Sequence, residues 1–87
     1  MMATTELLAA YSAYAAEYAK WESGFDLLNI FDQPEAPEKS IAAWAGETIA
    51  TRGSIAAALV EAHAGIEDVD CPEWRKEAYQ MIIEAAR

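Results

Sequence analysis

Large apolar side chains recur with a helical period along the first third of the chain. From Thr5 onward they alternate in steps of four and three residues, and a leucine or an aromatic residue fills every step. This spacing places them on one face of an α-helix and predicts a helix over residues 5–31. Thr4 or Thr5 is suited to cap its start, and Glu6 suits the positive end of the helix dipole. We call this stripe the aromatic seam, and its members are Leu7, Tyr11, Tyr14, Tyr18, Trp21, Phe25 and Leu28.

A proline-containing linker, residues 32–37, follows the seam. Each proline disfavours helical backbone at the preceding residue, so Pro34 is expected to end the first helix. Pro37 suits the first position of a helix, because a backbone N–H would be unsatisfied there in any case. A second helix is therefore expected over residues 37–52.

Two interpretations remain open for residues 38–64. In one, Gly53 ends a helix and Ser54 caps another over residues 54–64. In the other, one helix runs through, and Gly46 and Gly53 form a shallow groove for large neighbours. We favour a break or kink near Gly53. Apolar residues at helical spacing are expected on the inner side: Ile41, Ala45, Ile49, Ala56 and Val60.

The last helix has a strong start signal. Asp70 suits the N-cap, Glu73 stands three residues later as in a capping box, and Val69 and Trp74 are spaced as a hydrophobic staple. Gly65 is typical of the residue after a helix C-terminus. A helix is expected over residues 71–86, with an inner face of Trp74, Ala78, Met81, Ile82 and Ala85. Because no segment alternates as a strand would, the sequence predicts a single all-α domain, residues 1–87, of three or four helices.

The predicted first helix is long for a chain of this size. Residues 5–31 as one helix would span about 40 Å, whereas a compact globule of 87 residues is roughly 30 Å across. The aromatic seam is interpreted first as an internal core. The excess length means that the helix bends at Gly24, that the domain is elongated, or that part of the seam is buried against a second copy or another partner.

The charge is strongly negative and unevenly distributed. The chain has 15 acidic and 6 basic residues and a net charge of −9, and the surplus lies before Cys71. Such a field repels phosphate groups, so we expect no direct binding to nucleic acid or to a membrane surface. A basic protein surface is the natural electrostatic partner, although solubility alone would also account for the charge. We expect a cytoplasmic protein, since one cysteine forms no internal disulfide and neither a signal peptide nor a membrane span is apparent.

Few residues suit catalysis or metal binding. His63 is the sole histidine, and its position near a predicted helix end explains it structurally. Cys71 is next to acidic residues, which disfavour a reactive thiolate. The acidic residues from Glu61 to Glu73 lack the glycine and the spacing of an EF-hand loop. We therefore expect no enzyme activity, no cofactor and no metal.

The remaining hypothesis is an acidic protein-interaction module. It is expected to be an inhibitor or adaptor that docks on a basic, nucleic-acid-binding surface of a larger protein, acting as a nucleic-acid mimic. The alternative is a structural subunit that self-assembles, for example as a homodimer, through the aromatic seam. The candidate acidic residues form a first cluster of Asp26, Asp32, Glu35 and Glu38 and a second cluster of Glu61, Glu67, Asp68 and Asp70.

Overall fold

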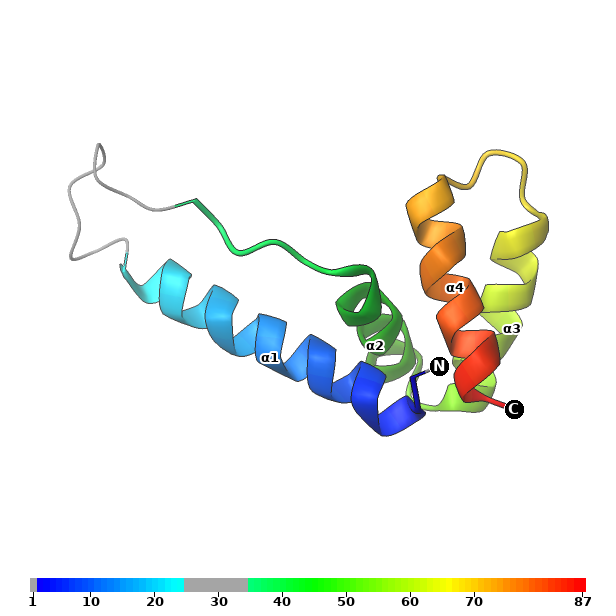
Figure 1. The fold of residues 1–87 in the computed structure, drawn as a ribbon, viewed down its shortest axis with the longest axis horizontal. Coiled ribbons are helices and arrows are strands. Elements are labelled where there is room, and N and C mark those ends of the chain that lie inside the picture. Colours follow the sequence, from blue (N-terminus) through cyan, green and yellow to red (C-terminus); the bar gives the residue numbers. More distant parts are fainter. Residues whose placement is uncertain (1, 25–34) are drawn as a thin grey trace.

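The computed structural model describes residues 2–24 and 35–87, and within them the regular elements are all α-helices. The four helices, shown in Figure 1, are α1 (Thr4–Ser23), α2 (Ile41–Arg52), α3 (Ile55–Glu67) and α4 (Glu73–Ala85). The prediction of an all-α bundle with a long N-terminal helix is therefore confirmed.

Helix α2 lies at the centre of the arrangement. It packs against α1 on one side and against the antiparallel pair of α3 and α4 on the other (Figure 1). Only the N-terminal half of α1 lies against α2, and its C-terminal half extends away beside the segment 35–40. The molecule measures 46 × 28 × 21 Å. The structure is therefore elongated, which is one of the three alternatives expected from the length of the first helix.

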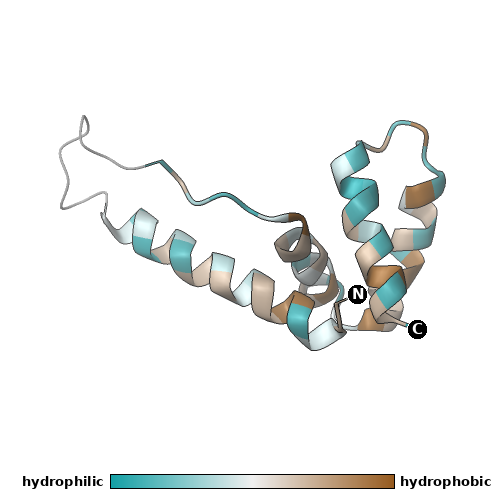
Figure 2. Cartoon of the chain, in the orientation of Figure 1, coloured by the Kyte–Doolittle hydropathy of each residue, from teal (hydrophilic) through white to brown (hydrophobic). Residues whose placement is uncertain are grey.

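The core is small and sits where the four helices meet. Leu7 and Ile82 are the largest side chains with no exposed surface, and most of the other buried residues are alanines. Figure 2 shows the hydrophobic colouring gathered at this junction. Small side chains allow the helices to approach closely. At Gly46 a Cβ atom would lie only 2.0 Å from the carbonyl oxygen of Leu7, so α2 has no room for a side chain where it meets the backbone of α1.

Helix α1 differs from the prediction at its N-terminus. Its N-cap is Ala3, so neither Thr4 nor Thr5 caps it, and Glu6 Oε1 instead accepts a hydrogen bond of 3.2 Å from the Ala3 N–H. The carboxylate at the third helical position satisfies a backbone donor that a cap residue would otherwise serve. The helix ends at Ser23. Its expected continuation to residue 31 lies outside the described residues.

Helix α2 begins later than predicted. The expected start at Pro37 is wrong, because residues 35–40 are non-helical and the helix begins at Ile41. Ser40 is the N-cap, and its hydroxyl accepts a hydrogen bond of 3.1 Å from the Ala43 N–H. Pro37 has no side-chain oxygen that could accept such a hydrogen bond, and Ser40 therefore marks the start of the helix.

The break at Gly53 is confirmed. Gly53 has φ 88°, a left-handed conformation that glycine adopts without a Cβ penalty. Ser54 then caps α3 by accepting a hydrogen bond of 3.1 Å from the Ala57 N–H. Ala56 and Val60, expected on the inner side, are exposed instead. The break turns α3, so the inner face of α2 does not continue into it.

The boundary between α3 and α4 was predicted incorrectly. Helix α3 passes through Gly65 to Glu67, and α4 starts at Glu73 with Pro72, not Asp70, as its N-cap. A Cβ at Gly65 would lie 2.1 Å from the Tyr79 ring, so this glycine serves close packing inside a helix and does not end one. Val69 is 90% exposed, which rules out the staple.

Candidate functional site

The aromatic seam is covered over only part of its length. Leu7 is completely buried, Tyr11 and Tyr14 are half-buried, and Tyr18 is 37% exposed. The cause is the position of α2, which lies against the N-terminal half of α1 (Figure 1). Beyond that contact the rings pack on one another: the Tyr14 and Tyr18 centroids are 5.9 Å apart and the Tyr18 and Trp21 centroids 5.3 Å. The seam members Phe25 and Leu28 lie outside the described residues.

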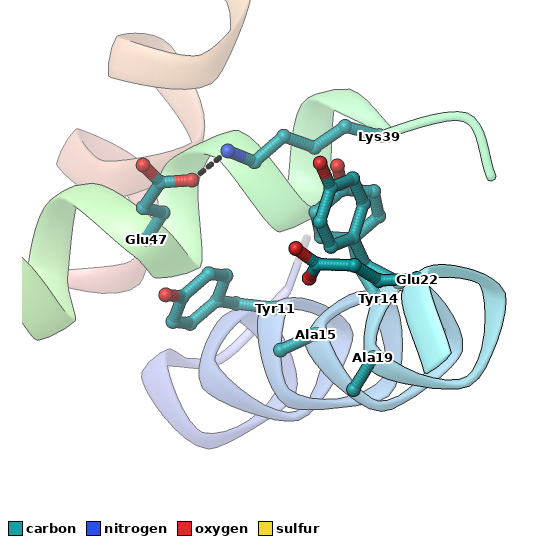
Figure 3. A pocket seen from close by; sticks show the side chains of 8 residues that line it. Tyr11, Tyr14, Ala15, Ala19, Glu22, Lys39 and Glu47 are labelled. Atoms are coloured by element: carbon teal, nitrogen blue, oxygen red, sulfur yellow. Dashed lines mark ion pairs between the residues drawn. The ribbon is translucent and has the colours of Figure 1, made fainter. Parts of the chain in front are cut away.

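The uncovered part of the seam forms one wall of a groove, which we call the tyrosine groove (Figure 3). Its volume is about 380 Å³, near the lower end of the range for small-ligand sites, about 300–1,000 Å³. The wall from α1 combines rings, alanines and a carboxylate, and the opposite wall consists of charged side chains. Its lining residues are Tyr11, Tyr14, Ala15, Tyr18, Ala19, Glu22, Lys39 and Glu47.

Lys39 joins the segment 35–40 to the helices. Its ammonium group forms an ion pair with Glu47 of α2. It also lies 3.7 Å from the centroid of the Trp44 ring and 5.3 Å from that of Tyr14. Partial burial lowers the pKa of Lys39, since desolvation disfavours its charged form. Sequence analysis missed this residue, because its contact with Tyr14 arises only when the segment 35–40 lies along α1.

A second groove lies further along α1. It has a volume of about 390 Å³ and is lined by Glu17, Lys20, Trp21, Glu35 and Pro37. Trp44 makes a separate aromatic contact with Trp74, the centroids being 5.0 Å apart. Trp74, expected in the core, is 40% exposed. Its ring therefore packs against Trp44 at the surface and is not part of the core.

The first acidic cluster is described in part. Glu35 and Glu38 are exposed on the non-helical segment beside α1. The other two members, Asp26 and Asp32, lie outside the described residues. Glu35 also borders the second groove, which brings this carboxylate to the same end of the molecule as the exposed half of α1.

The second acidic cluster is divided by the fold. Glu61 binds other helices of the same chain: its carboxylate accepts hydrogen bonds from Arg52 Nε at 2.6 Å and from the Tyr79 hydroxyl at 3.1 Å. This network ties α2, α3 and α4 together. Burial and the Glu61 carboxylate raise the pKa of Tyr79. Because its charge is matched by Arg52, Glu61 contributes little to an acidic surface.

The other members of the second cluster are at the surface. Glu67, Asp68 and Asp70 are exposed at the turn between α3 and α4. The Asp68 carboxylate accepts a hydrogen bond of 3.0 Å from the Asp70 N–H, which orders the turn. This turn and the segment 35–40 lie on opposite sides of α2 (Figure 1). The structure therefore places Glu35 and Glu38, the described members of the first cluster, on a different surface from this turn.

The charge surplus is displayed outward. Within residues 2–24 and 35–87 no acidic side chain is classed as buried, and the ion pairs are Lys39 with Glu47 and Arg52 with Glu61. Both of these carboxylates are partly buried. Two of the 6 basic residues thus pair with partly buried carboxylates. Fewer basic residues therefore remain to balance the negative charge of the exposed carboxylates.

The two residues considered above for catalysis are His63, in α3, and Cys71, in the segment before α4. His63 is exposed and Cys71 is partly buried with a free thiol. Among the described residues, no group of three or more His, Cys, Asp and Glu side chains is placed to hold a metal ion. None of the helices described has the length and apolar character needed to cross a bilayer.

Comparisons with known proteins returned no match: no family model, no curated protein and no solved structure resembles this chain.

Proposed function

We propose that this chain is a non-enzymatic, cytoplasmic protein-interaction module, an inhibitor or adaptor that docks its acidic surface on a basic, nucleic-acid-binding surface of a larger protein. The observation that carries this proposal is the outward display of uncompensated carboxylates around a small core. Complementary potentials speed encounter and set orientation between partners. The single cysteine and the absence of a membrane-spanning helix among the described residues support the assignment to the cytoplasm.

Two separated surfaces are available for docking. One is the turn that carries Glu67 and Asp70, and the other is the segment that carries Glu35 and Glu38. Reversing the charges in pairs decides between them. A variant with Glu67→Lys and Asp70→Lys and a variant with Glu35→Lys and Glu38→Lys alter the net charge equally, so each is the charge-matched control for the other.

The experiment starts from a protein captured by the tagged chain from a lysate of its native host. Binding of the purified partner is then measured for both variants at low and high salt, with duplex DNA as a competitor. We expect one variant to lose about tenfold in affinity at low salt and the salt dependence to be steep, because screening shortens the reach of charges from about 10 Å at 0.1 M to about 3 Å at 1 M. DNA should displace the chain. Salt-insensitive binding, unchanged in both variants, would contradict the docking proposal.

Self-assembly through the aromatic seam is the second candidate function. It is favoured by the exposure of Tyr18, a large aromatic residue that α2 leaves uncovered. In this case a second copy would cover the exposed half of α1. Light scattering tests it directly, since a strict monomer at high protein concentration removes this candidate.

A further inference from the structure

We infer that the tyrosine groove binds an arginine side chain of the partner protein, with Glu22 as the counter-ion and the Tyr18 ring as the stacking surface. This inference rests on the proposed function, because it names the group by which a basic partner would be held.

The arrangement along α1 supplies the two kinds of group that recognise a guanidinium. Tyr14, Tyr18 and Glu22 follow one another at intervals of four residues, so they lie on one face of the helix. On this face of α1 the two tyrosine rings are therefore followed by a carboxylate. In Figure 3 the Glu22 carboxylate points into the groove from the α1 side, beside Tyr14.

The charge of the groove favours a cation. Its lining contains two carboxylates, Glu22 and Glu47, and one ammonium group, Lys39. Lys39 pairs with Glu47, whereas Glu22 is exposed and forms no ion pair with any residue that the structure describes. The groove thus keeps one uncompensated negative charge, and the field of the whole chain, with its net charge of −9, has the same sign.

The protein already holds one cation in this manner. The Lys39 ammonium lies against the rings of Trp44 and Tyr14 while it pairs with Glu47. Tyr18 and Glu22 offer the same combination of ring and carboxylate further along the groove. Cations are attracted to aromatic faces within about 6 Å of the ring centroid. The half of the groove that Lys39 occupies therefore indicates which kind of group suits the open half, beside Tyr18 and Glu22.

Arginine fits the open half better than lysine does. Its guanidinium is planar, stacks on an aromatic face and donates two parallel hydrogen bonds to a carboxylate. A lysine ammonium is more strongly hydrated and acts as a point charge. Recognition by Tyr18 together with Glu22 uses both properties of the guanidinium at once.

The test uses three blocked tripeptides and the full chain. Triarginine, trilysine and tricitrulline are titrated while amide chemical shifts are followed by NMR. We expect triarginine to bind more tightly than trilysine and to change the amide chemical shifts of Tyr18, Glu22 and Lys39. Tricitrulline, which is neutral, should not bind. Equal affinity for triarginine and trilysine, or shifts confined to the turn between α3 and α4, overturns the inference.

Three variants separate specific recognition from general attraction. Glu22→Gln and Tyr18→Leu should each weaken triarginine binding by about two- to fivefold, as expected for one exposed ion pair or cation–π contact. Glu77→Gln removes the same charge from the exposed surface of α4 and should change binding less than twofold by screening. Circular dichroism checks that all variants fold. Equal weakening by Glu22→Gln and Glu77→Gln overturns the inference.

The same variants distinguish this inference from the proposed function. If the purified partner loses affinity on charge reversal at Glu67 and Asp70 but binds Glu22→Gln normally, docking stands and the groove inference fails. If partner binding is insensitive to salt and to every charge variant, the proposed function fails. In that case triarginine binding by the groove still stands or falls on the peptide titration alone.

Discussion

Replacing Gly46 with alanine is a sensitive test of how α1 is attached to the rest of the molecule. In an isolated helix this change is stabilising by about 1 kcal/mol, because alanine has the higher helix propensity. Here the added Cβ would lie 2.0 Å from the carbonyl oxygen of Leu7, 2.7 Å from its carbonyl carbon and 2.9 Å from Tyr11 Cβ. The two nearest atoms belong to backbone, so no side-chain rotation relieves the clash.

The size of the effect follows from the displacement that the alanine requires. Ordinary contacts of a Cβ atom begin near 3.4 Å, so α1 must move by roughly 1.4 Å, the difference between 3.4 and 2.0 Å, to make room for the added atom. That movement loosens the packing around Leu7, which is fully buried. Overpacking of this kind costs about 3 kcal/mol at the upper end of its usual range. After the gain in helix propensity, we expect a net loss of about 2 kcal/mol in the free energy of unfolding.

Urea denaturation followed by far-ultraviolet circular dichroism measures this loss, and thermal unfolding should show a midpoint lower by about 8–16 °C. Ala50→Gly is the matched control, since Ala50 is exposed on the same helix and its replacement should cost about 1 kcal/mol through propensity alone. If Gly46→Ala were instead stabilising by the amount that Ala50→Gly destabilises, the close approach of α1 and α2 at this residue would be refuted.

Three further predictions concern stability. Leu7→Ala should lower the free energy of unfolding in urea by about 3–5 kcal/mol, because it opens a cavity in the fully buried core; a loss below about 1 kcal/mol would contradict that burial. Ser40→Ala should cost about 1 kcal/mol by removing the cap of α2, whereas Ser40→Asp, which keeps an acceptor oxygen, should cost less in the same assay. The raised pKa of Tyr79 means that the folded chain holds the phenol proton more tightly than the unfolded chain does, so its contribution to stability is complete below about pH 10 and is lost as the pH rises through the folded-state pKa. The unfolding free energy of the wild type minus that of Tyr79→Phe should therefore stay constant below about pH 9 and fall as the pH rises above about 10, with contributions common to both chains, such as that of Lys39, cancelling. A difference that stays constant above about pH 10 would show that Tyr79 is not perturbed.

Local chemistry was sufficient to predict the helices and one of their breaks. The period of the aromatic seam from Leu7 to Trp21 predicted a long N-terminal helix, because residues spaced alternately by four and three positions lie on one face of an α-helix. Gly53 and Ser54 predicted the end of α2 and the start of α3, because a left-handed residue and a cap act within a few residues of the chain.

The errors at helix ends arose where tertiary contacts overrode local preference. Gly65 resembled a helix terminus but lies inside α3, where the Tyr79 ring from α4 requires a residue without a side chain. Asp70 and Val69 resembled a capping box and a staple, yet α4 begins after them. A glycine selected for close packing and one selected for chain reversal have the same appearance in the sequence.

The composition of the candidate site depended on the tertiary structure in the same way. Charge and spacing pointed to an acidic surface and an aromatic seam, because both are properties of the chain itself. Which carboxylates remain at the surface was decided by contacts between helices: Glu61 is bound by Arg52 and Tyr79, whereas Glu22 is exposed on α1 beyond Tyr18. Lys39 enters the tyrosine groove only because the segment 35–40 runs back along α1 (Figure 1). Helix periodicity acts between neighbours in sequence, whereas burial, ion pairing and ring contacts depend on where distant segments meet, and only the folded arrangement determines that.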